Sequence, residues 1–66
     1  MNIIVNGKKR EVAESLTVKE LLNHFDIKPG SVVVELNRGI IDREQFGITK
    51  IKENDQLEIV HFVGGG

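Results

Sequence analysis

The segment 17–25 constrains the fold most, because its apolar residues repeat at helical spacing while the rest of the chain reads as short strands. Thr17 stands three residues before Glu20, so each side chain can accept a hydrogen bond from the backbone N–H of the other in a capping box. The apolar stripe consists of Val18, Leu21, Leu22 and Phe25. A single amphipathic helix must bury such a stripe against a sheet formed by the remaining segments.

A β-hairpin is predicted before the helix. Residues 3–5 are β-branched and stop at Asn6-Gly7, a strong signal for a two-residue turn, after which residues 8–14 can return as a second strand. We interpret the basic cluster at 8–10 as a charged sheet edge that discourages aggregation, rather than as a phosphate site. The residues expected to face the core are Ile3, Val5 and Val12.

Two more strands are predicted after a turn at Pro29-Gly30. Residues 31–37 alternate in polarity, and a turn at 37–39 leads to a short strand at 40–41. In the longer strand, one face carries Val32, Val34 and Leu36, and the other carries Val33 and Glu35.

A second helix-start signature follows at Asp42, three residues before Gln45. It predicts one helical turn over residues 43–46, closed by Gly47 and seated on the core by Phe46. A polar turn at 53–55 then introduces the final strand, residues 57–63.

These elements predict an α+β domain over residues 1–63, with a mixed sheet of four to five strands and one long helix packed on one face. A long helix placed after two strands of a short chain fits the β-grasp arrangement. We expect one domain near the lower size limit for folding unaided, because the chain has 66 residues.

Composition excludes several classes of function. The chain has no cysteine, and therefore no disulfide, thiolate ligand or thiol nucleophile. Nine basic and ten acidic residues give a formal charge of −1, which argues against nucleic acid as a partner. No signal peptide, membrane span, metal-ligand spacing or nucleophile–base pair is visible. We expect a soluble cytoplasmic monomer that binds no metal or cofactor and is not an enzyme.

The final residues Gly64, Gly65 and Gly66 are a candidate functional segment, which we predict to be a flexible tail. Glycines add no packing, and a terminal glycine leaves its carboxylate unhindered for entry into a narrow active site. Three consecutive glycines at one chosen place arise by composition roughly 3 times in ten thousand. A frayed end or a cloning scar are the alternatives.

The last strand also predicts a docking surface. Its side chains alternate, so Leu57 and Ile59 can face the helix while Val60 and Phe62 face outward beside Val33. Exposed apolar side chains gathered in this way mark binding surfaces. The opposite strand register, which would bury Phe62, is the alternative. The predicted partner-binding residues are Val33, Val60, Phe62 and Val63.

His61 and His24 are the two histidines of the chain. For His61, no partnering acid or nucleophile stands nearby in the sequence, so it is weak evidence for a proton donor. We interpret His61 as a rim residue of the last strand and His24 as part of the polar side of the helix.

These motifs resemble those of the ThiS family of ubiquitin-like sulfur carriers, and the likeness covers the whole chain. The residues that carry it are the helix start at 17–22, the segment 37–46 with Arg43-Glu44-Gln45-Phe46, the turn at 54–57, and the ending 61–66. Many relatives have glycine where this chain has Asn54, but asparagine tolerates a left-handed backbone next best.

The resemblance implies a β-grasp fold whose first and last strands lie parallel at the sheet centre. It further implies that the carboxylate of Gly66 attacks the α-phosphate of ATP in a ThiF-like adenylyltransferase. Sulfur from a persulfide donor protein would then displace AMP, and a ThiG-like thiazole synthase would consume the resulting thiocarboxylate. ATP belongs to the partner enzyme in this scheme.

Three alternatives stay open at this point. A molybdopterin-type carrier would use the same chemistry with a different sulfur acceptor. A ubiquitin-like modifier would join Gly66 to lysines of other proteins. A plain interaction module would carry an inert tail.

Overall fold

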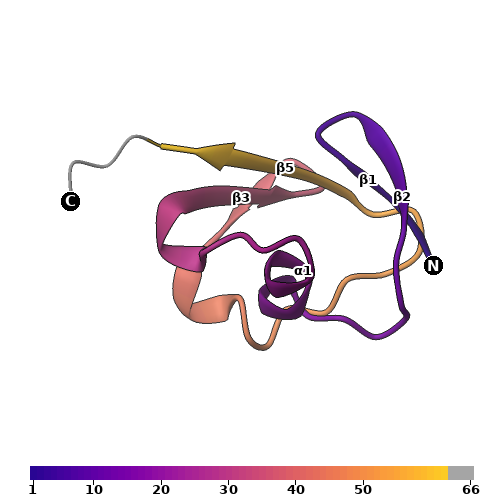
Figure 1. Cartoon of the computed structure of the whole chain (residues 1–66), viewed down its shortest axis with the longest axis horizontal. Coiled ribbons are helices and arrows are strands. Elements are labelled where there is room, and N and C mark those ends of the chain that lie inside the picture. Colours follow the sequence, from indigo (N-terminus) through magenta and orange to yellow (C-terminus); the bar gives the residue numbers. More distant parts are fainter. Residues whose placement is uncertain (63–66) are drawn as a thin grey trace.

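The computed structural model describes residues 1–62 (Figure 1). Val63 and the glycines 64–66 lie outside the described residues, so the predicted tail and the domain boundary at Val63 stay predictions. The elements are β1 (Asn2–Val5), β2 (Lys8–Glu11), α1 (Val18–His24), β3 (Val32–Leu36), β4 (Gly39–Ile41) and β5 (Gln56–His61), with 3₁₀ turns at Pro29–Ser31 and Arg43–Gln45. One sheet and one α-helix therefore make up most of residues 1–62, as the sequence predicts.

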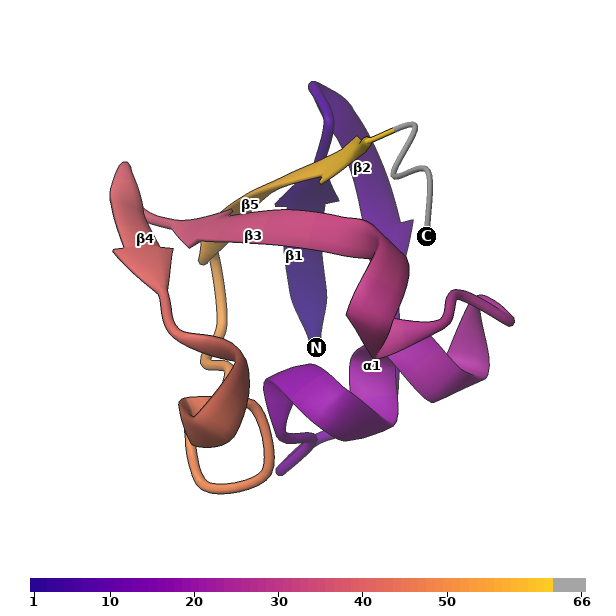
Figure 2. The same ribbon diagram turned by 90° about the vertical axis from the view of Figure 1, so that its left-hand side faces the viewer.

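The strands form a five-stranded mixed sheet in the order β2-β1-β5-β3-β4. β5 lies at the centre, parallel to β1 and antiparallel to β3. Figures 1 and 2 show α1 on one side of this sheet. The parallel first and last strands are the arrangement that the family resemblance implies.

The hairpin between β1 and β2 forms at the predicted turn. Asn6 and Gly7 both have left-handed backbones, with φ of 50° and 82°, as a tight two-residue turn requires. β2 ends at Glu11, short of the predicted residue 14. Val12 is nevertheless buried, because its N–H donates to the Met1 carbonyl at 2.9 Å and holds the chain against the core.

The predicted capping box starts α1. The Glu20 N–H donates to Thr17 Oγ1 at 3.1 Å, and the Thr17 N–H donates to Glu20 Oε1 at 2.8 Å. The backbone hydrogen bond from Thr17, followed by its side-chain hydrogen bond, lowers the pKa of the Glu20 carboxyl. The first turn of the helix is therefore held by a carboxylate.

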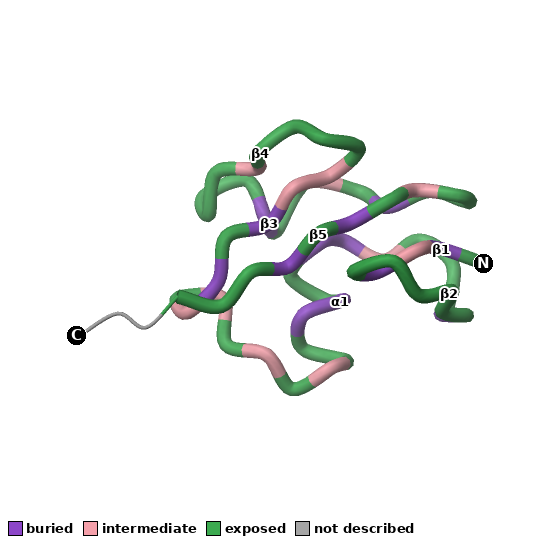
Figure 3. The backbone as a smooth tube through the Cα atoms, turned by 90° about the horizontal axis from the view of Figure 1, so that it is seen from above, coloured by how far each residue is buried: buried purple, intermediate pink, exposed green. Residues whose placement is uncertain are grey.

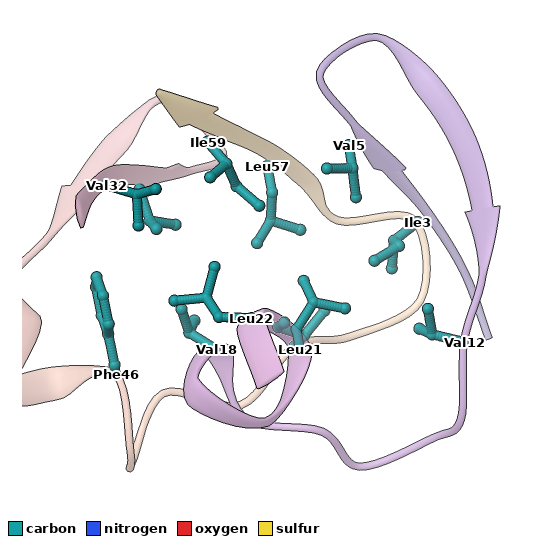
Figure 4. Packing of buried hydrophobic residues seen from close by; sticks show 12 residues of the cluster. Ile3, Val5, Val12, Val18, Leu21, Leu22, Val32, Phe46, Leu57 and Ile59 are labelled. Atoms are coloured by element: carbon teal, nitrogen blue, oxygen red, sulfur yellow. The ribbon is translucent and has the colours of Figure 1, made fainter. Parts of the chain in front are cut away.

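The core lies between α1 and the sheet, as Figure 4 shows. It contains the predicted hairpin residues and most of the helix stripe, while Phe25 and Leu36 are half-buried at its margin. The buried hydrophobic residues are Ile3, Val5, Val12, Val18, Leu21, Leu22, Val32, Val34, Phe46, Ile51, Leu57 and Ile59.

The turn at 43–46 corrects one detail of the sequence analysis. Phe46 is buried as predicted, but the Asp42 side chain makes no capping hydrogen bond. The turn closes through the backbone instead, with the Gln45 N–H donating to the Asp42 carbonyl at 2.8 Å. This 3₁₀ turn has only three residues and is anchored to the core by the buried Phe46, so it forms without a side-chain cap from Asp42.

Candidate functional site

β5 presents two different faces along its length. Leu57 and Ile59 point into the core, while Val60 is 53% exposed and Phe62, directly after the strand, is 43% exposed. Figure 3 shows this end of β5 as exposed. The predicted register is confirmed, and the alternative in which Phe62 is buried is wrong.

Val33 lies beside Val60 on the outer face of the sheet. The two residues are direct partners in the pairing of β3 with β5, and Val33 is 39% exposed. The Phe62 N–H donates to the Ser31 carbonyl at 3.2 Å, which keeps Phe62 next to the start of β3. We call Val33, Val60 and Phe62 the apolar patch. Val63, the fourth predicted member, lies outside the described residues.

Ile40 is an exposed apolar residue that the sequence analysis did not assign to this surface. It is 67% exposed and pairs with Glu35, two residues along β3 from Val33, so it lies on the same face of the sheet. The sequence predicted which face of β3 carries Glu35 but not the pairing register with β4, and that register is what places Ile40, because partners in an antiparallel pair share a face.

Asparagine side chains hold both ends of β5. Near its carboxyl end, Asn6 Oδ1 accepts from the Ile59 N–H at 2.7 Å, and Asn6 Nδ2 donates to the Ile59 carbonyl at 3.2 Å. At its amino end, Asn37 Oδ1 accepts from the Gln56 N–H at 3.0 Å. The strand that leads to the tail is therefore fixed along its length.

His61 ends β5 and is exposed, as expected for a rim residue. It pairs with Val32 and so lies on the helix side of the sheet, opposite the apolar patch. His24, also exposed, ends α1. Among residues 1–62, no group of three or more His, Cys, Asp or Glu side chains is arranged to hold a metal ion. Over the same residues, none of the helices has the length and apolar character needed to span a membrane.

Residues 3–66 match the ThiS family. The chain belongs to this family. A crystal structure of the thiamine biosynthesis protein ThiS from Geobacter metallireducens superposes with a TM-score of 0.87 at 45% identity, covering 100% of both chains. This likeness to a ThiS protein confirms the predicted β-grasp fold.

Curated relatives of this ThiS-family chain fall into two groups by length. The sulfur carrier protein ThiS of Bacillus subtilis is 40% identical over 63 residues, which cover 94% of this chain and 96% of the relative. The thiazole synthase of Magnetococcus marinus is 36% identical over 66 residues, which cover 100% of this chain and 20% of the relative. The chain thus spans about a fifth of the length of that larger enzyme.

Proposed function

We propose that this protein is a sulfur carrier of thiamine biosynthesis, adenylated and then thiocarboxylated at Gly66. The observation that carries the proposal is the placement of β5. This strand lies at the sheet centre, paired with β1 and β3, and ends at His61. Residues 62–66 therefore follow in sequence directly after the central strand. The match to the ThiS family and the curated ThiS relatives favour this function over a molybdopterin-type carrier or a protein modifier.

The chemistry explains why such a carrier needs an activating enzyme. A carboxylate is a poor electrophile, so one oxygen of the Gly66 carboxylate first bonds to the α-phosphorus of ATP and pyrophosphate leaves. A persulfide sulfur then attacks the acyl carbon and AMP leaves with that oxygen. Cleavage of the S–S bond by a thiol frees the thiocarboxylate. A ThiF-like adenylyltransferase and a persulfide donor protein would supply these steps.

The sulfur acceptor is proposed to be a ThiG-like thiazole synthase. Two proteins named thiazole synthase, from Magnetococcus marinus and Paramagnetospirillum magneticum, contain a region 36% and 35% identical to this whole chain. A chain like this one is therefore compatible with close association with that enzyme. In those two proteins the matching region and the rest of the thiazole synthase share one polypeptide, whereas here the carrier and the synthase could also be separate chains.

The apolar patch is proposed to dock the partner that receives the tail. Fixing each glycine of the tail costs about 1–2 kcal/mol of backbone entropy. Burying a phenylalanine or valine side chain contributes about 1.5–3 kcal/mol. Contacts of Val60, Phe62 and the adjacent Val63 would therefore offset the ordering of residues 64–66.

Intact-mass measurement of the protein from its own cells tests this function. Replacing oxygen by sulfur adds nearly the same mass as oxidising Met1, so fragmentation must locate the change at Gly66. We expect the added mass on the C-terminal fragment. A terminus that stays unmodified after incubation with ATP, a sulfur source and the cognate activating enzyme would favour the inert-tail module instead.

A further inference from the structure

A cationic hollow lies on the helix side of the sheet, beside the carboxyl end of β5. It is an open hollow of about 380 Å³ with an apolar floor that includes Val5 and Ile59. Its rim carries the cationic side chains of Lys8 and Arg10 together with the imidazole of His61. Neither the proposed sulfur chemistry nor the apolar patch uses this hollow.

The strand register explains why the basic side chains gather here. Lys8 pairs with Val5 and Arg10 pairs with Ile3, so these two of the three basic residues of β2 point to the same side of the sheet as the core residues. His61 pairs with the buried Val32 and shares that side. Figure 4 shows Val5 and Ile59 on this same side of their strands, facing α1.

Residues after α1 form the apolar wall of the hollow. Phe25 and Ile27 line it and are both half-buried, so their apolar surface is partly open to solvent. The Arg10 guanidinium carbon lies 5.7 Å from the centroid of the Phe25 ring, a cation–π distance that holds this charge over the wall. The hollow therefore joins fixed positive charge to exposed apolar surface.

No acidic side chain lines the hollow among residues 1–62. Asp26 and Glu11 are neighbours of lining residues in the sequence, but both are exposed and lie outside the lining. The positive charge is thus local, in a chain whose formal charge is −1. The positive charge of the hollow is complementary to an anionic ligand. Its apolar floor favours a ligand that also carries an apolar group.

We propose that the cationic hollow binds an acidic segment of a partner protein, with carboxylates at the rim and an apolar side chain on the floor. Lys8, Arg10 and His61 are all exposed, so the hollow lacks the buried, convergent donors that hold a small anion away from water. An open surface with charge around an apolar centre has instead the composition of a protein-binding surface.

The hollow and the apolar patch lie on opposite faces of the end of β5, since His61 points to one face and Val60 to the other. A partner that receives the tail would contact the strand from both sides. The assignment of the partner as an enzyme of sulfur transfer rests on the proposed function. The preference of the hollow for acidic, apolar peptides does not depend on it.

The test is an NMR titration of the isotope-labelled protein with the peptide acetyl-Glu-Glu-Leu-Phe-Glu-Asp-amide. We expect saturable shifts of the backbone amides of Lys8, Arg10, Phe25 and His61. Lys8→Glu should weaken the fitted affinity about fivefold, as expected for the loss of a favourable ion pair at an exposed site. Arg10→Glu serves as a second variant, and a dispersed spectrum shows that each variant is folded.

Lys9→Glu is the matched control, because it makes the same charge change in the same strand. Lys9 pairs with Ile4 and therefore points to the opposite face of the sheet. Affinity should change less than twofold in this variant. If Lys8→Glu and Lys9→Glu weaken the affinity for the peptide equally, the overall charge of the protein explains the effect, and the proposal is overturned.

Two further titrations complete the test. A peptide with glutamine and asparagine in place of its acids should not bind. Inorganic phosphate alone should neither reproduce the shifts nor displace the acidic peptide. Binding of phosphate at the same residues would mark a small-anion site, and the absence of saturable peptide binding would leave no site; either result overturns the proposal. Thiocarboxylate formation at Gly66 is measured separately, so failure of the hollow is distinguishable from failure of the proposed function.

Discussion

The side chain of Asn6 binds both backbone groups of Ile59, accepting from its N–H at 2.7 Å and reaching its carbonyl at 3.2 Å. β1 ends at Val5, so the asparagine amide continues the parallel ladder where the backbone turns away into the hairpin. The same residue supplies the left-handed backbone of the turn, with φ of 50°. One side chain thus couples the first turn of the chain to the strand that precedes the tail.

Asn6→Gly separates these two roles. Glycine accepts the left-handed backbone without strain, so the turn should persist while both side-chain hydrogen bonds to Ile59 are lost. We expect the free energy of unfolding to fall by about 1–3 kcal/mol, at about 0.5–1.5 kcal/mol for each hydrogen bond. Urea denaturation measures this change.

Asn54→Gly provides the matched control. Asn54 also has a left-handed backbone, with φ of 69°, but its side chain makes no hydrogen bond within residues 1–62. Its backbone N–H, which donates to the Asn2 carbonyl at 2.7 Å, is kept in the variant. Equal losses of stability at the two positions would show that glycine entropy, not the contact with Ile59, accounts for the Asn6 result.

The capping box makes part of the stability depend on pH. Hydrogen bonds from Thr17 lower the pKa of Glu20 below its ordinary value of 4.5, so the unfolded chain binds this proton more tightly than the folded one. The stabilisation is present above the unfolded pKa and is lost as pH falls through the lower, folded pKa. Glu20→Gln should therefore flatten the loss of stability on acidification below about pH 4.5. Thermal melts at several pH values measure this.

A conservative change elsewhere controls for general effects of acid. Glu44→Gln removes an exposed carboxylate in the 3₁₀ turn and should leave the acid-dependent slope nearly unchanged. If both variants reduce the slope equally, overall charge and not the capping box sets the pH dependence.

Local patterns predicted most of this fold because its elements are specified by nearby residues. The helix start at Thr17, the turn at Asn6-Gly7 and the alternation of Val60 with Ile59 each depend on a few neighbours in the sequence. Asp42 shows the limit of such patterns, since the spacing to Gln45 is present but the side chain does not cap.

Long-range contacts could not be predicted in the same way. Asn6 and Ile59 are 53 residues apart, and nothing local to either residue indicates their contact. The cationic hollow depends on β2, β5 and the segment after α1 together. The sequence alone shows the basic cluster at 8–10 as one charged edge, but strand pairing divides it, with Lys8 and Arg10 on one face and Lys9 on the other.

Phe46→Ala should nearly unfold the protein. Phe46 is buried and seats the turn Arg43–Gln45 on the core. Removing a buried phenylalanine costs about 3–5 kcal/mol. A domain of this size has little more stability than that to lose. Phe46→Leu keeps most of the apolar volume and should remain folded, as circular dichroism during thermal melts can show.

Phe62→Ala tests the apolar patch without disturbing the core. Phe62 is 43% exposed and follows the end of β5, so the variant should keep nearly the stability of the parent protein. We expect its affinity for the cognate activating enzyme to fall about tenfold, which corresponds to about 1.4 kcal/mol of lost apolar contact. Ile48→Ala removes a side chain that is 71% exposed in a segment held to the start of α1, where the Val18 N–H donates to the Thr49 carbonyl, and it should leave affinity unchanged. Titration calorimetry of the three proteins decides the question, because unchanged affinity for Phe62→Ala would mean that the tail is delivered without this surface.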